Sequence, residues 1–119
     1  MTPTLANVRF LSRDEGGRHQ PPDGATYSTV ARFQTPSGVD QSWSVVLEFI
    51  GTPKFGEFTV TQVRFLSPAA PAQLLSSGRG FELIEGPRVV ANALVVSAPQ
   101  RRLRDAAVGS PRYLEEVNA

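Results

Sequence analysis

The sequence predicts an all-β fold, a small closed antiparallel six-stranded β-barrel, and three observations lead to this prediction. Short segments alternate apolar and polar residues with a period of two, which is typical of half-buried strands. Ten glycines and ten prolines provide many turns in a chain of 119 residues. One of the six expected strands is apolar on both faces, and closure of the sheet is favoured because it removes exposed edges.

The first three expected strands lie in the first half of the chain. Strands are expected at residues 5–11 and 27–33, separated by a loop that contains Pro21-Pro22 and Asp23-Gly24. A turn at residues 36–38 precedes the third strand. There the alternation predicts one inward row, and the Trp43 indole is expected in the core rather than on a ligand platform. That row consists of Trp43, Val45, Leu47 and Phe49.

The last three expected strands are less regular. In the fourth, Phe58 and Val60 have one parity and Val63 and Phe65 the other, so a β-bulge near residues 61–62 is expected to keep all four inside. The fifth strand is expected at residues 79–84. The sixth, residues 88–97, is apolar on both parities and is therefore expected to be covered on both sides.

The chain divides into a barrel domain, residues 1–99, and an Arg-rich C-terminal tail, residues 100–119. A length of 119 residues suits one core. The first 99 residues carry eight basic and eight acidic side chains, and the tail carries four arginines and three acids. The tail is expected to be a short helix or partly disordered, and a partner-binding helix is the alternative.

Composition argues against several classes of function. The chain has no cysteine and a single histidine, His19, so a catalytic nucleophile paired with a general base is not expected. A metal site or another cofactor is not expected either. We therefore expect that the protein is not an enzyme. The phosphate-binding pattern Gly-x-x-x-x-Gly-Lys-Ser/Thr is missing, so no nucleotide is expected. No apolar run reaches the roughly 18 residues of a membrane helix, and a cytoplasmic protein without membrane contact is expected.

The most distinctive stretch is a charged turn that follows the first strand. Val8 and Phe10 alternate with Arg9, and Gly16-Gly17 then permits positive φ values. The turn is decorated by Arg13, Asp14, Glu15, Arg18 and His19.

This stretch resembles the third domain of elongation factor Tu, a β-barrel. The match is the segment Phe10-Leu11-Ser12-Arg13-Asp14-Glu15-Gly16-Gly17-Arg18-His19, followed by Pro21 and a strand that starts at Tyr27. A second match is Gly80-Phe81-Glu82-Leu83-Ile84-Glu85-Gly86-Pro87-Arg88, which is similar to the late hairpin of that domain. The resemblance implies the same barrel fold and a binding role related to translation. Between the two matches only the strand pattern agrees.

The resemblance also implies binding residues, since the family domain contacts the tRNA backbone. The positions that match are Arg18 and His19 in the early turn and Glu85 and Gly86 in the late turn. Arg13 and Arg88 add positive charge beside them. The chain departs from the family at Ser28-Thr29-Val30 and at Pro87. The alternative for the early residues is a solvated turn.

Three functions follow from these features, and none is catalytic. The first is a binding module that presents its barrel to a protein partner, for which the resemblance suggests a component of translation. The second is an RNA-binding module, although a pI of 8.3 is below the values above about 9 that are usual for such domains. The third is a structural or regulatory protein that acts through its tail. Oligomeric state is left open.

Overall fold

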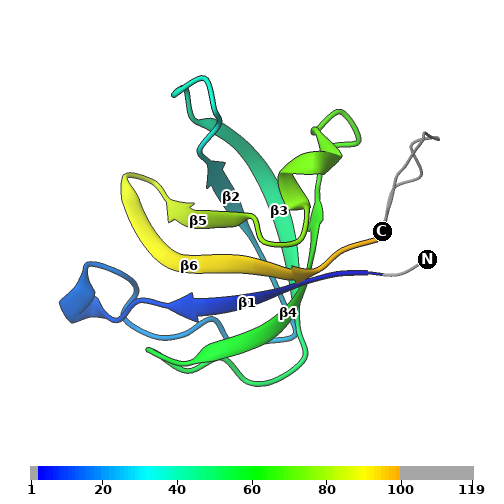
Figure 1. Ribbon diagram of the computed structural model, residues 1–119. Coiled ribbons are helices and arrows are strands. Elements are labelled where there is room, and N and C mark those ends of the chain that lie inside the picture. The colour runs from blue at the N-terminus through cyan, green and yellow to red at the C-terminus, as the bar shows by residue number, and fades with distance from the viewer. Residues whose placement is uncertain (1–2, 100–119) are drawn as a thin grey trace.

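The sheet of this protein closes on itself because each of its six strands pairs with a neighbour on both sides. The structure is a computed structural model that describes residues 3–99. Its six antiparallel strands follow the order β1-β4-β3-β2-β5-β6 around a closed barrel (Figure 1). The strands are β1 Thr4–Phe10, β2 Thr26–Phe33, β3 Gln41–Phe49, β4 Phe58–Phe65, β5 Gly80–Glu85 and β6 Arg88–Ser97. The predicted fold class is confirmed, and expectations for residues 100–119 lie outside the described part.

The core is built from the alternate residues of each strand, as the period of two predicts. Phe10, Phe33, Leu47 and Leu83 are fully buried, and β3 contributes the expected row with Val45. Trp43 lies at one end of that row. It packs edge-on to Phe65 with ring centroids 6.4 Å apart but stays half-buried, so the core placement of its indole is only partly confirmed.

One end of the barrel is filled by a short 3-10 helix, η2 (Ala72–Leu75), in the connection between β4 and β5. Leu74 and Leu75 are buried and belong to the core cluster. The sequence gave no reason to place these leucines in the core, because no strand is expected in this connection. Because β4 ends and β5 begins at this end, the helix lies opposite the two turns described below (Figure 1).

Strand β4 corrects one expectation. It pairs without a break with β1, from Val63 to Phe58, and with β3, so the expected bulge near residues 61–62 is wrong. Thr59 and Thr61 point inward with Val63, while Phe58 and Val60 are exposed. The buried Thr61 hydroxyl donates to the Thr59 carbonyl at 2.9 Å, and a hydroxyl satisfied in this way is tolerated in an apolar core.

Strand β6 corrects a second expectation, that it is covered on both sides. Ala93 and Val95 point inward, but Leu94 and Val96 are 44% and 46% exposed, so the strand is not covered on both sides. The shifts of register lie in β6 instead of β4. One occurs opposite Leu5 and Ala6 of β1 and the other opposite Leu83 and Ile84 of β5. The second shift is why the neighbours Val90 and Ala91 are both buried.

No helix among residues 3–99 is long and apolar enough to cross a membrane.

Candidate binding surface

The early and late glycine turns lie together at one end of the barrel, although they are far apart in the sequence. Arg18, in the loop after β1, pairs through its Nη1 with a Glu85 carboxylate oxygen at the end of β5. The hydroxyl of Tyr27 donates to the same oxygen. Arg88 donates from Nη1 to the carbonyl of Gly17 at 3.2 Å. In Figure 1 both turns are at the left, where β1 ends and β6 begins.

Tyr27 is held under this network by aromatic packing. Its ring meets Phe10 edge-on, with centroids 5.7 Å apart, and lies parallel to Phe49 at 6.5 Å. The guanidinium carbon of Arg18 lies 5.4 Å from the Tyr27 ring centroid, within cation–π range. Burial of the phenol, followed by its hydrogen bond to the Glu85 carboxylate, raises the pKa of Tyr27 to about 12. The neutral phenol donates this bond at physiological pH, and the raised pKa keeps it neutral at pH values well above its ordinary pKa.

The loop after β1 is ordered by its own hydrogen bonds. A 3-10 turn, η1 (Arg13–Glu15), follows Ser12, whose N–H donates to the Glu15 carboxylate at 3.1 Å. Arg9 donates to the other oxygen of Glu15 at 3.1 Å. These two contacts, the backbone bond first, lower the pKa of the exposed Glu15 carboxyl. The turn then leaves through Gly16, whose φ of 88° confirms the expected left-handed conformation.

Gly17 has a different role from the one its sequence suggested. Its φ is not positive, but an added Cβ would lie 2.1 Å from the Leu11 carbonyl oxygen. Two hydrogen bonds draw these segments together, from the N–H of Arg18 to the Leu11 carbonyl at 3.1 Å and from the N–H of Gly17 to the Ser12 carbonyl at 2.8 Å. Gly17 is required for close approach of two backbones, and this approach sets the position of Arg18.

The structure divides the six residues nominated from the sequence into two groups. Arg18, Glu85 and Arg88 lie in the network that ties the two turns together. The remaining three, Arg13, His19 and Gly86, are exposed around it. The side chains of Arg18 and Glu85 are only 27% and 34% exposed. Their polar groups are bonded within the protein, to each other, to the Gln20 carbonyl and to the Tyr27 hydroxyl, which leaves less capacity for an external phosphate.

Among residues 3–99 no group of three or more histidine or acidic side chains is placed to hold a metal ion.

A second surface, which the sequence did not single out, lies on the outside of β4, β1 and β6. The pairing registers place its residues in two cross-strand rows, Phe58–Arg9–Asn92 and Val60–Asn7–Leu94. Ile50 extends the second row, because its N–H donates to the Val60 carbonyl at 3.2 Å. We call this surface the apolar face. Its exposed members are Ile50 (61%), Phe58 (63%), Val60 (42%), Leu94 (44%) and Val96 (46%).

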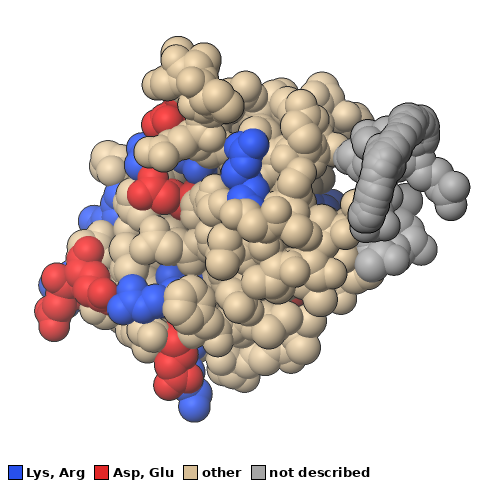
Figure 2. All heavy atoms as spheres, in the orientation of Figure 1, with Lys and Arg blue, Asp and Glu red and all other residues tan. Residues whose placement is uncertain are grey.

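The opposite side of the barrel is polar by comparison. Strands β2 and β3 turn Ser28, Ser42 and Ser44 to solvent, and the outward Val46 is 7% exposed. Val30, at 39%, is the large apolar side chain exposed on these two strands. Figure 2, drawn from the side of β1, β4 and β6, shows charged atoms gathered mostly at the left, and a largely uncharged surface across the middle.

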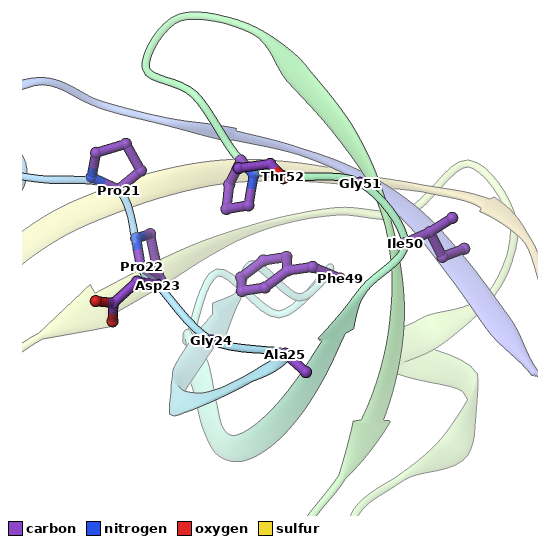
Figure 3. A pocket seen from close by; sticks show the side chains of 10 residues that line it. Pro21, Pro22, Asp23, Gly24, Ala25, Phe49, Ile50, Gly51 and Thr52 are labelled. Atoms are coloured by element: carbon purple, nitrogen blue, oxygen red, sulfur yellow. The ribbon is translucent and has the colours of Figure 1, made fainter.

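A shallow groove of about 510 Å³ lies beside the aromatic cluster, between the loop before β2 and the loop after β3. Pro22 and Pro53 are buried in its walls. The Phe49 ring points toward Pro22 (Figure 3). Ile50 points away from this ring, so it belongs to the outer surface. Asp23 is the charged residue in the lining.

Two signals in the sequence could have revealed the apolar face. Phe58 and Val60 have the same parity, and so do Leu94 and Val96. Because apolar residues were expected to point inward, the sequence predicted a bulge in the fourth strand and cover on both sides of the sixth. In β4 an unbroken register places Phe58 and Val60 outside. In β6 the regular pairing up to Val95 places Leu94 outside, and Val96, at the register shift opposite Leu5 and Ala6, is also exposed.

A scan against protein-family models finds no match to this chain, and a search of curated proteins finds no relative. The resemblance to the third domain of elongation factor Tu thus stays a prediction from the two glycine-bearing segments.

Proposed function

We propose that this protein is a non-catalytic binding module that docks a protein partner on the apolar face of β4, β1 and β6. The observation that carries the proposal is the concentration of exposed apolar side chains on one side of a closed barrel. Single exposed apolar residues are ordinary, but a continuous group suggests a site of interaction. The barrel has no free edge, so a partner would pack against side chains rather than add a strand.

The size of the apolar face suits a protein interface. With roughly 200 Å² for a fully exposed large apolar side chain, the five exposed fractions correspond to on the order of 500 Å² of apolar surface. A standard interface buries about 800 Å² per partner, of which roughly 60% is apolar. The apolar face together with the polar residues within and beside it, such as Asn7 and Asn92, would supply such an area.

The RNA-binding alternative is supported less well by the geometry. Arg18 and Arg88 make bonds within the protein, to Glu85 and to the Gly17 carbonyl. Arg13 and His19 remain exposed beside them, which is a small number of cations for a phosphate backbone. The resemblance to the elongation factor domain suggests which partners to test first, namely protein components of translation.

A capture experiment tests the proposal. The full chain, the double variant Val60→Lys with Leu94→Lys, and the control Val30→Lys are each immobilised and exposed to source lysate with and without nuclease. We expect the control to retain the captured proteins and the double variant to lose them, because the two lysines put charge in the centre of the apolar face. Nuclease should have no effect. Capture that survives the double variant but disappears with nuclease would favour RNA instead.

A further inference from the structure

Two exposed carboxylates border the apolar face and have no ion-pair partner within residues 3–99. Glu57 directly precedes Phe58 at one end of the face. Glu48 lies on the outside of β3, in the cross-strand row Glu48–Gln62–Leu5–Ser97. The other acids of the strands, Glu82 and Glu85, are paired with arginines. The border of the face is thus open to a cationic group.

The C-terminal segment begins at this same surface. Ser97 ends β6 in the row that contains Glu48, and Val96 is itself a member of the apolar face. At about 4.8 Å per strand, Glu48 is about 14 Å from Ser97 across the sheet. Phe58 shares its row with Asn92, so it lies about 17 Å back along β6. At about 3.3 Å per residue, six or seven residues beyond Pro99 would reach any part of the face.

The composition of residues 100–119 matches this surface in two respects. Arg101, Arg102 and Arg104 come first, where the distance to Glu48 can be spanned. Apolar residues follow at Leu103, Val108, Tyr113, Leu114 and Val117. Because the segment is covalently attached, its effective concentration at the face is in the millimolar range, so even a weak contact would be populated.

We propose that residues 100–119 bind back onto the apolar face, with apolar side chains over Val60 and Leu94 and the arginine cluster beside Glu48 and Glu57. The chain then carries its own occupant for this surface, and a partner must displace it. The proposal concerns the same surface as the proposed function but requires no partner, so the two can fail separately.

The lack of cysteine allows a direct test in the full chain. A nitroxide attached to the single cysteine of Ser110→Cys broadens amide signals of nearby residues in nuclear magnetic resonance spectra. We expect strong broadening at Phe58, Val60 and Leu94 and little at Ser28, Ser42 and Ser44 on the opposite side. A second sample mixes nitroxide-labelled protein without isotope and isotope-enriched protein without nitroxide. Only a contact between two copies broadens signals in this mixture, so it distinguishes such a contact from an intramolecular one.

Three variants of the labelled chain sharpen the result. Val60→Lys with Leu94→Lys should abolish the selective broadening, while Val30→Lys on the other side should leave it. Reversal of the charges at Arg101, Arg102 and Arg104 to glutamate should weaken docking about tenfold, because attraction to the two exposed carboxylates, Glu48 and Glu57, is replaced by repulsion. Weak broadening on both sides alike, or selective broadening that is equally strong in the mixed sample, would overturn the proposal. Loss of partner capture in the double variant would still support the proposed function in that case.

Discussion

Replacement of the two adjacent glycines by alanine should produce very different losses of stability. At Gly16 the added methyl group meets no atom within 4 Å, and the cost comes only from the φ of 88°. A left-handed conformation costs an L-residue about 1–2 kcal/mol. At Gly17 the Cβ would be 2.1 Å from the Leu11 carbonyl oxygen and 2.6 Å from its carbon. Both contacts are to backbone, so a side-chain rotation cannot relieve them.

The Gly17→Ala variant must therefore separate the two segments of the early turn. That movement stretches the hydrogen bonds from Arg18 to the Leu11 carbonyl and from Arg88 to the Gly17 carbonyl, and it displaces Arg18 from Glu85. Overpacking costs about 1–3 kcal/mol, and each lost hydrogen bond adds about 1 kcal/mol. We expect a total loss of about 3–5 kcal/mol for Gly17→Ala, against about 1 kcal/mol for Gly16→Ala.

Urea denaturation followed by the fluorescence of Trp43, the single tryptophan, measures both variants. For a domain of this size a loss of 3 kcal/mol lowers the midpoint by about 1–3 M, at a slope of about 1–3 kcal/mol per molar urea. The Gly16→Ala variant is the matched control, since it makes the same chemical change one residue away. Equal midpoints for the two variants would refute the inference that close backbone approach, rather than turn conformation, is what requires Gly17.

Two further predictions concern the aromatic cluster and the end of the barrel opposite the turns. In a Tyr113→Phe background, in which Tyr27 is the single tyrosine, absorbance titration should give a midpoint near pH 12 in the folded protein and near 10 in urea. Because the folded pKa is the higher one, the stability that the neutral Tyr27 phenol contributes is complete below about pH 10 and is lost as pH rises toward 12. A folded midpoint near 10 would contradict the burial of the phenol. Leu74→Ala should lower the free energy of unfolding by about 2–5 kcal/mol because Leu74 is 4% exposed. The control Leu66→Ala, at a residue that is 61% exposed, should change it by no more than about 0.5 kcal/mol. Similar urea midpoints for the two variants would show that η2 does not fill the core.

The sequence was sufficient for the strands and for the closed sheet. Each strand begins and ends within about a residue or two of its expected position, because alternation reflects a local property, the opposite directions of successive side chains. The inward row of β3 from Val45 to Leu47 was readable for the same reason. Closure could be expected because six short strands leave two costly edges unless they join.

The sequence also nominated residues of both turns, but only the tertiary structure decided what they do. Arg18 and Glu85 are 67 positions apart, and no local pattern shows that they share an ion pair. The same holds for Gly17, whose two possible roles, a special φ or a close approach, look identical in sequence. The contact with Leu11 that separates them exists only after β1 and the turn have folded.

Which apolar residues face outward was likewise decided by the fold. Phe58 and Val60 are more apolar than Thr59 and Thr61, yet the threonines are inside because β4 must keep one register with β1 and β3 at once. A strand between two fixed neighbours cannot shift by one residue without turning every side chain over. Local composition therefore determines that these segments are strands, while the pairing of the whole barrel determines which of their faces meets solvent.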